Sequence, residues 1–206
     1  MNSILETETL EGQQSDSWCW AATTRIFSKH YYSNISLTQQ YAVEIIESQP
    51  AYSSGINSLE KAQATINLYI SNSSNAAIST TVQNYKTYSS SAVQNFINDG
   101  HVLCISRGKY IPENSNGIYR YESGHLTLLY GYFSIDSQIY FLIRDPGVEG
   151  YDGYTYVWTY SKLYCDMLFD EGYVTAWDGA IVPTTTYSGS YDNWSLHECT
   201  ILYPNQ

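Results

Sequence analysis

The sequence contains the stretch Gln13-Gln14-Ser15-Asp16-Ser17-Trp18-Cys19-Trp20-Ala21-Ala22, in which an amide side chain stands six residues before a cysteine. Apolar residues recur at helical spacing through Phe27, which predicts a helix over residues 19–31 with one buried face. Ser17 and Asp16 are good N-cap residues for this helix. Cys19 would lie in its first turn, where unpaired backbone N–H groups and the helix dipole favour a thiolate. A buried, inert thiol is the commoner role of a cysteine, so its partners have to be sought elsewhere in the chain.

The composition indicates a globular protein with an acidic surface. The chain has 206 residues, of which 43% are hydrophobic, enough for one domain with a large core. Nine Lys and Arg against twenty Asp and Glu give a net charge of −11. Such a surface repels nucleic acid and anionic lipid, so neither is expected as a partner, and basic substrates are favoured. No apolar run approaches the length of a membrane span.

The N-terminal residues and the cysteines bear on the compartment. The first residues lack the basic and apolar regions of a signal peptide, which fits a cytosolic protein or one whose leader has been removed. The 22 tyrosines and many small polar residues are typical of secreted bacterial proteins, so an extracellular location is expected, with the cytoplasm as the alternative. Cys104 lies in an apolar run and is expected to be a core thiol. Cys165 and Cys199 could pair with each other.

Helical signals come before strand signals along the chain, which predicts an α+β fold with an antiparallel sheet. The expected helices, opened by polar caps and closed by Pro50 or Gly100, span residues 19–31, 36–48, 57–70 and 90–98. The expected strands span residues 102–106, 126–133, 139–144, 154–160 and 173–177, with a weak one at 78–82. We expect one two-lobed domain, with a helical lobe at about 13–100 and a β-rich lobe, a sheet or half-barrel, at about 101–206.

A nucleophilic cysteine needs a base, and the chain has four histidines. His30 is about three turns from Cys19 along the same helix, which is too far to reach the thiol. His197 has no distinctive context, whereas His101 precedes a strand and is a competitor. His125 opens a nearly continuous apolar strand, which would fix its ring at the cleft between the lobes. His125 is therefore the preferred base.

A catalytic imidazole also needs an acceptor on its second ring nitrogen. The strand at 139–144 ends at Asp145, and antiparallel pairing with the His125 strand would bring Asp145 beside His125. Asp145 also suits the start of an Asp-Pro-Gly turn, and the two roles are compatible. Asp136 and Asp152 are weaker candidates because both fall in loops.

Acyl transfer further requires hydrogen-bond donors for the oxyanion. The backbone N–H of Cys19 is one candidate, and the carboxamide of Gln13 or Gln14 is the other. The sequence has no HExxH, CxxC, EF-hand or glycine-rich phosphate motif, and no spacing indicates a carboxylate pair for glycoside hydrolysis. No metal or other cofactor is expected.

These segments resemble those of the papain-like cysteine peptidases. Gln13, five residues and Cys19-Trp20-Ala21-Ala22 are similar to the active-site segment of the bacterial branch, which includes bacteriocin-leader-peptidase-like domains, staphopains and effector proteases of plant pathogens. Gly124-His125 followed by an apolar strand and Gly131-Tyr132 is similar to the histidine segment. Residues 143–146 resemble the third segment, in which this branch carries Asp instead of Asn.

The resemblance implies roles for the matching residues and a cleft between a helical lobe and a barrel-like lobe. Cys19 would be the nucleophile, His125 the base, Asp145 the orienting residue and Gln13 the side-chain oxyanion donor. Trp158 would either shield the Asp145–His125 pair from water or serve as a core tryptophan. The chain departs from the plant enzymes because it lacks their Cys-Gly-Ser-Cys-Trp sequence and has few cysteines and no visible propeptide.

Three functions are compatible with these residues. The first is a cysteine endopeptidase that acts on a peptide or protein substrate through an acyl-enzyme. The second is a thiol enzyme with the same site, of the transglutaminase-like, deamidating or isopeptide-cleaving type. The third is a binding module without activity, in which Cys19 would have ordinary reactivity. The sequence carries no signal for an oligomeric state.

Overall fold

The computed structural model describes residues 3–5, 11–52, 59–84, 86–113, 119–147, 153–168, 173–184 and 191–193. Its helices are α1 (Cys19–Tyr31), α2 (Gln39–Glu47), α3 (Leu59–Asn72), α4 (Ser90–Asn98) and α5 (Tyr160–Tyr164). Its strands are β1 (Ser3–Ile4), β2 (Thr80–Asn84), β3 (Lys86–Tyr88), β4 (Leu103–Pro112), β5 (Tyr119–Ile135), β6 (Gln138–Asp145), β7 (Tyr154–Thr159), β8 (Cys165–Leu168), β9 (Tyr173–Pro183) and β10 (Tyr191–Asn193).

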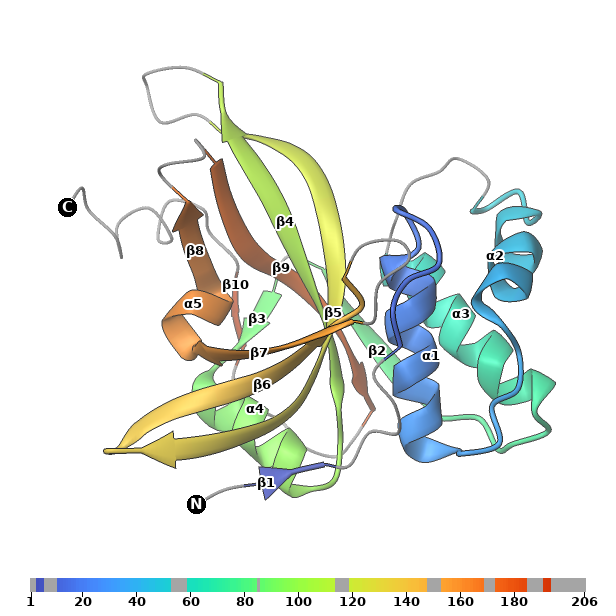
Figure 1. Cartoon of the computed structure of the whole chain (residues 1–206), viewed down its shortest axis with the longest axis horizontal. Coiled ribbons are helices and arrows are strands. Elements are labelled where there is room, and N and C mark those ends of the chain that lie inside the picture. The colour runs from blue at the N-terminus through green and yellow to red at the C-terminus, as the bar shows by residue number, and fades with distance from the viewer. Residues whose placement is uncertain are drawn as a thin grey trace.

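Eight of these strands form one antiparallel sheet, and β3 pairs with β10 in a separate ribbon. The main order is β2-β9-β4-β5-β6-β7, with β1 added to β5 and β8 added to β9. The sheet is open, since β2 and β7 end the described strand order without pairing to each other. Figure 1 shows the strands spreading from a narrow centre beside α1. The predicted α+β class with an antiparallel sheet is thus confirmed.

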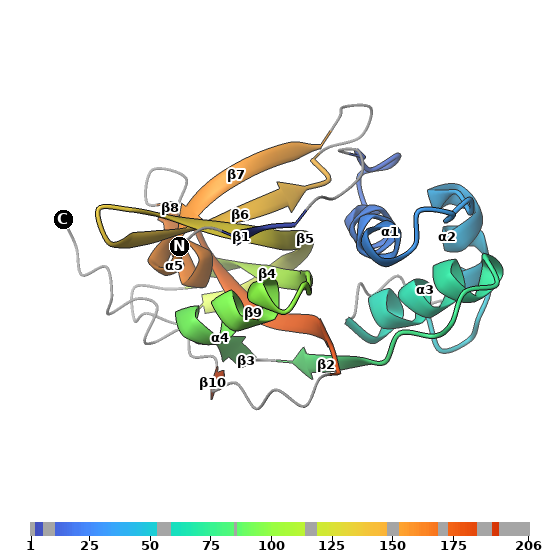
Figure 2. The same cartoon turned by 90° about the horizontal axis from the view of Figure 1, so that it is seen from below.

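Helices cover both faces of the sheet, which explains the continuous apolar runs of the central strands. Helices α1, α2 and α3 lie together beside the sheet (Figures 1 and 2), and their core includes Cys104 and Leu128. The neighbouring residues Leu103 and Leu129 belong to a second cluster, which contains the apolar face of α4. Because side chains alternate along a strand, β4 and β5 need apolar residues at successive positions.

Helices α1 to α4 follow the sequence-based expectation except at two caps, whereas α5 begins at Tyr160, where a strand was expected. Helix α1 has the predicted bounds, and the predicted stripe of α3 is buried (Leu59, Ala62, Ile66, Tyr69 and Ile70). The N-cap of α1 is Trp18, and no side chain caps it, because residues 15–18 form a turn closed by the Trp18 N–H to the Ser15 carbonyl. The N-cap of α2 is Thr38 and not Ser36; its side chain accepts from the Tyr41 N–H.

Strands β4, β5, β6 and β9 are longer than predicted, and the helical part of the chain is shorter. Strand β5 begins at Tyr119, so His125 lies inside a strand and does not open it. The helical lobe was expected to extend to residue 100. Strand β2 instead pairs with β9, and α4 contacts β5, so the helical part ends with α3. Gly100 does follow α4 with a φ of +82°, as the C′ assignment predicts.

None of the helices in the described ranges is both long enough and apolar enough to cross a membrane.

Candidate active site

Cys19 is the first residue of α1 and is 4% exposed. Two buried hydroxyls fix this helix against its neighbours. Thr23 Oγ1 donates to the Leu126 carbonyl of β5 at 2.8 Å, and the Tyr69 hydroxyl of α3 donates to the Ala21 carbonyl at 3.1 Å. The start of α1 is thereby held beside the segment of β5 that carries His125.

His125 and Asp145 meet across the β5–β6 pair. His125 Nε2 lies 2.6 Å from Asp145 Oδ1, so the expected juxtaposition of these residues is confirmed. Asp145 Oδ1 also accepts from the Gly147 N–H at 2.8 Å, which combines the turn role with the orienting role. The His125 side chain remains 39% exposed, against 14% for Asp145, so the imidazole is accessible from outside.

A β-bulge places Asp145 on the correct face of the sheet. Near the hairpin turn, Ile135 of β5 pairs with Gln138 of β6. An irregularity between Leu129 and Gly131 then shifts the register by one residue. Beyond it, Leu128 pairs with Arg144. Without that extra residue, Asp145 would stand opposite Leu128, whose side chain packs in the α1–α3 core. The bulge puts Asp145 opposite the next position of β5, on the face that carries His125.

The three side chains shift one another's pKa values. Burial alone would raise the pKa of the Cys19 thiol, but the hydrogen bond and the charge of His125, with backbone N–H groups of Leu126 and Trp20, lower it. Burial would lower the pKa of His125, but its hydrogen bonds to Asp145 and Cys19 raise it to about 10. Burial would raise the pKa of Asp145, and its bond to His125 lowers it. The favoured state is a thiolate, an imidazolium and a carboxylate.

The imidazole is oriented by these contacts. Its Nε2 faces Asp145, and its coupling to Cys19 lowers the pKa of the thiol. The imidazole is thus hydrogen-bonded to the Asp145 carboxylate and electrostatically coupled to the Cys19 thiol, an arrangement that can activate a thiol for attack on a carbonyl.

Gln13 lies between the start of α1 and the Asp145 turn. Its backbone N–H donates to the Pro146 carbonyl at 3.0 Å, and its side-chain Nε2 donates to the Asp16 carbonyl at 3.0 Å. Gln13 is 4% exposed, whereas the Gln14 side chain is exposed. Of the two predicted donors, Gln13 therefore has the more constrained side chain.

The buried Gln39 of α2 holds the segment that precedes α1. Its Nε2 donates to Glu11 Oε1 at 2.7 Å and to the Gly12 carbonyl at 2.9 Å, and its Oε1 accepts from the Gln14 N–H at 3.2 Å. Nothing in the sequence around Gln39 indicated this role. The segment that carries Gln13 is thus fixed by side chains from the helices.

A cavity of about 460 Å³ adjoins the His125–Asp145 pair on the sheet side. Trp158 lines this cavity and stacks on Tyr156, with ring centroids 5.3 Å apart. The guanidinium carbon of Arg107 lies 4.5 Å from the Trp158 ring centroid. Trp158 is therefore a partly buried cavity residue near the pair. The sequence reasoning missed Arg107, Lys109 and Tyr156, which also line the cavity; the alternating basic residues after Ser106 were a usable signal.

The remaining candidates lie elsewhere. His30 Nε2 faces the Gly100 carbonyl at 3.1 Å, and His101 Nδ1 faces the Tyr31 hydroxyl at 3.3 Å, both at the far end of α1 from Cys19. Asp136 sits in the β5–β6 turn with a φ of +47°. Cys104 is a fully buried free thiol, and Cys165 is disulfide-bonded. His197, Asp152 and Cys199 lie outside the described residues.

Over the described ranges, no three His, Cys, Asp or Glu side chains are grouped so that they could hold a metal ion. No protein-family model matches the chain, and no curated protein matches it. The fold and the site therefore define only a class, an α+β protein with a Cys–His–Asp arrangement between a helix start and a sheet.

Proposed function

We propose that the protein is a cysteine endopeptidase that hydrolyses peptide bonds through Cys19, His125 and Asp145. The observation that carries the proposal is the 2.6 Å bond between His125 and Asp145 at the start of α1, together with the coupling of His125 to Cys19, which lowers the pKa of the thiol and raises that of the imidazole. An inert core thiol has no need of such partners. Cys104, buried without them, has its pKa raised.

The mechanism follows from these protonation states. The Cys19 thiolate attacks the carbonyl carbon and forms a C–S bond, and the carbonyl electrons move to oxygen. The His125 imidazolium then gives its proton to the leaving nitrogen as the C–N bond breaks, which leaves an acyl-enzyme. Neutral His125 takes a proton from water, whose oxygen displaces Cys19 and releases the acid. Asp145 stabilises the imidazolium in both half-reactions.

The oxyanion would be bound by the backbone N–H of Cys19 and by the Gln13 carboxamide. Gln13 Nε2 carries two hydrogens, and the Asp16 carbonyl accepts one of them, so one remains for the oxyanion. The absence of a side-chain cap on α1 also leaves the N–H groups of its first turn to the site.

In this proposal the chain is papain-like, of the bacterial type described above, with the site between its helical part and its sheet. Trp158, stacked on Tyr156 beside the pair, would limit the access of water to Asp145. The disulfide at Cys165 supports an extracellular location, because disulfides persist in oxidising compartments.

The test is incubation with unfolded protein and peptide substrates, with products identified by mass. A peptidase gives two fragments that together gain one water, whereas a deamidase or a transferase leaves the backbone intact. We expect Cys19→Ala to reduce cleavage by about 10⁴-fold or more. Cys104→Ala, which changes the second free thiol among the described residues, should leave cleavage nearly unchanged. Equal cleavage by Cys19→Ala, or modification without cleavage, would contradict the proposal.

A further inference from the structure

One face of β4 changes from apolar to basic as it approaches the site. Leu103 and Ile105 pack in the α4 cluster, and two residues further along the same face comes Arg107, which lines the cavity beside His125. Arg107 is only 9% exposed, and its Nη2 donates to Thr175 Oγ1 at 2.7 Å. Burial of a guanidinium costs free energy unless its charge and donors are compensated. The hydrogen bonds of Arg107 therefore hold its positive charge at a fixed place in the cavity wall.

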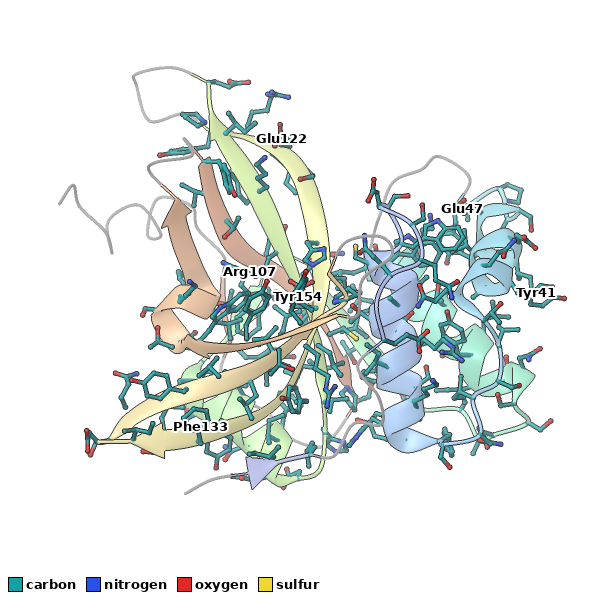
Figure 3. All side chains as sticks on the ribbon, in the orientation of Figure 1. Tyr41, Glu47, Arg107, Glu122, Phe133 and Tyr154 are labelled. Carbon is teal, nitrogen blue, oxygen red and sulfur yellow. The ribbon has the colours of Figure 1, made fainter. Side chains whose placement is uncertain are left out.

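Positive charge is concentrated in this cavity. Arg107, Lys109 and Lys162 line it, and they are three of the nine lysines and arginines in a chain of net charge −11. Three carboxylates lie near these cations: Asp145 pairs with His125, Glu122 lies 2.7 Å from Lys109 Nζ, and Asp178 lies within the electrostatic reach of Arg107 and accepts from the Tyr110 hydroxyl at 3.5 Å. Of these three, Asp145 alone lines the cavity. In Figure 3, Arg107 lies near the middle of the molecule and Glu122 farther out along the β4–β5 ribbon.

Aromatic rings add shape to the cavity. The ring of Trp158 lies against the guanidinium of Arg107, and the ring centroid of Tyr173 lies 4.4 Å from Lys109 Nζ. The volume of about 460 Å³ suits one or two amino-acid side chains. Basic groups set among aromatic walls are chemically suited to a carboxylate on a short carbon stem.

The position of the cavity indicates which part of a substrate reaches it. His125 has to pass its proton to the leaving nitrogen, so the leaving part of a bound peptide lies on the His125 side of Cys19. The cavity is lined by His125 and Asp145 and continues from them over β4, β7 and α5. A group on the leaving part is therefore the one that can enter it.

We infer that this cavity binds a carboxylate on the leaving part of the peptide substrate, an inference that rests on the proposed peptidase function. The carboxylate comes either from an Asp or Glu side chain or from the C-terminus of the substrate. The net charge of the whole chain favoured basic substrates, but the lining of this cavity contains three Lys or Arg side chains and one Asp.

The first experiment compares cleavage of matched peptides that differ only on the leaving side. One pair carries Glu or Gln there, and a second pair ends in a free carboxylate or an amide, which separates the two sources. We expect the acidic member of at least one pair to be cleaved roughly three- to tenfold faster, with a ratio that falls as salt is added. Lys162→Glu should abolish this ratio, whereas Lys86→Glu on β3, the same charge change outside the cavity, should preserve it.

The second experiment measures binding without chemistry. Cys19→Ala protein is titrated calorimetrically with the acidic and the neutral forms of the leaving-side peptides. If an acidic form binds more tightly, and Cys19→Ala/Lys162→Glu loses this preference, carboxylate binding by the cavity is supported. That result holds even if no peptide is cleaved, and in that case the peptidase proposal alone fails. The inference is overturned if acidic and neutral peptides are cleaved or bound equally well. It is also overturned if the ratio of acidic to neutral cleavage is unchanged in Lys162→Glu and in Lys109→Gln. Either result leaves the peptidase proposal standing.

Discussion

At the scale of the residue, His125 is held between Cys19 and Asp145, and this determines its protonation. Its pKa is raised to about 10, and that of Cys19 is lowered. The thiolate–imidazolium pair therefore forms as pH rises through the lowered pKa of the thiol and is lost as pH rises through about 10. Activity should follow this window.

Asp145 can be tested by separating its charge from its hydrogen bond. Asp145→Asn keeps an acceptor for Nε2 but removes the charge that helps to raise the pKa of His125. We expect this variant to keep part of its kcat and to lose activity at a lower pH on the alkaline side. Asp145→Ala should lose about 10²-fold or more in kcat, because the imidazole is then not oriented. The measurement is kcat/KM against pH, and an unmoved alkaline limit in Asp145→Asn would show that the charge does not act on His125.

At the scale of the element, the site depends on the contact between α1 and β5. Thr23 Oγ1 joins this helix to the Leu126 carbonyl, whereas Thr24 Oγ1 bonds within α1 to the Trp20 carbonyl. Both threonines are fully buried, so the pair offers a matched comparison.

Thr23→Val should lower kcat more than Thr24→Val does. Each substitution preserves shape and removes one hydroxyl donor, which bonds to one carbonyl in Thr23 and is shared between the Trp20 and Ala21 carbonyls in Thr24. One such donor is worth about 1 kcal/mol, so the losses of stability should be similar. Only Thr23→Val releases the helix from the strand that carries His125, which should disturb the Cys19–His125 distance. Thermal unfolding and kcat are measured for both variants, so that a loss of kcat can be separated from a loss of stability. Equal kcat in two equally stable variants would mean that this bond does not position the site.

Helices α1 to α4 could be predicted because helical signals are local, and the juxtaposition of His125 with Asp145 could be predicted from hairpin geometry, whereas α5 was not predicted. Helical periodicity located α1 and α3, and Asp145 was found because a hairpin brings a strand end beside a strand start. The bulge after Leu129 could not be predicted, since it depends on how two strands twist and pack. The extension of β4 beyond Ser106 was missed because a basic, glycine-containing segment does not look like a buried strand.

At the scale of the whole molecule, one apolar cluster joins the helices to the sheet. It includes Ile26 of α1, Ile66 of α3, Leu128 of β5 and Ile181 of β9. The site lies where these parts meet, so its geometry should last only as long as their packing does.

We expect the helices and the sheet to unfold together. Circular dichroism, which follows the backbone, and tryptophan fluorescence, whose five reporters include Trp20 in α1 and Trp177 in β9, should give coincident transitions. Leu128→Ala removes a fully buried side chain and should lower the free energy of unfolding by about 2–5 kcal/mol while both transitions shift together. Separate transitions would show that the two parts are stable independently.

The central claim is that His125 converts Cys19 into a thiolate near neutral pH. It is tested most directly by the pH dependence of Cys19 alkylation with iodoacetamide, followed by peptide mapping to distinguish it from Cys104, with Cys19→Ala as the control for the mapped peptide. We predict a midpoint well below the ordinary thiol pKa of about 8.5. In His125→Ala the midpoint should move above that value, because burial then acts without its partner. A Cys19 that titrates like an ordinary thiol in both proteins would contradict the account.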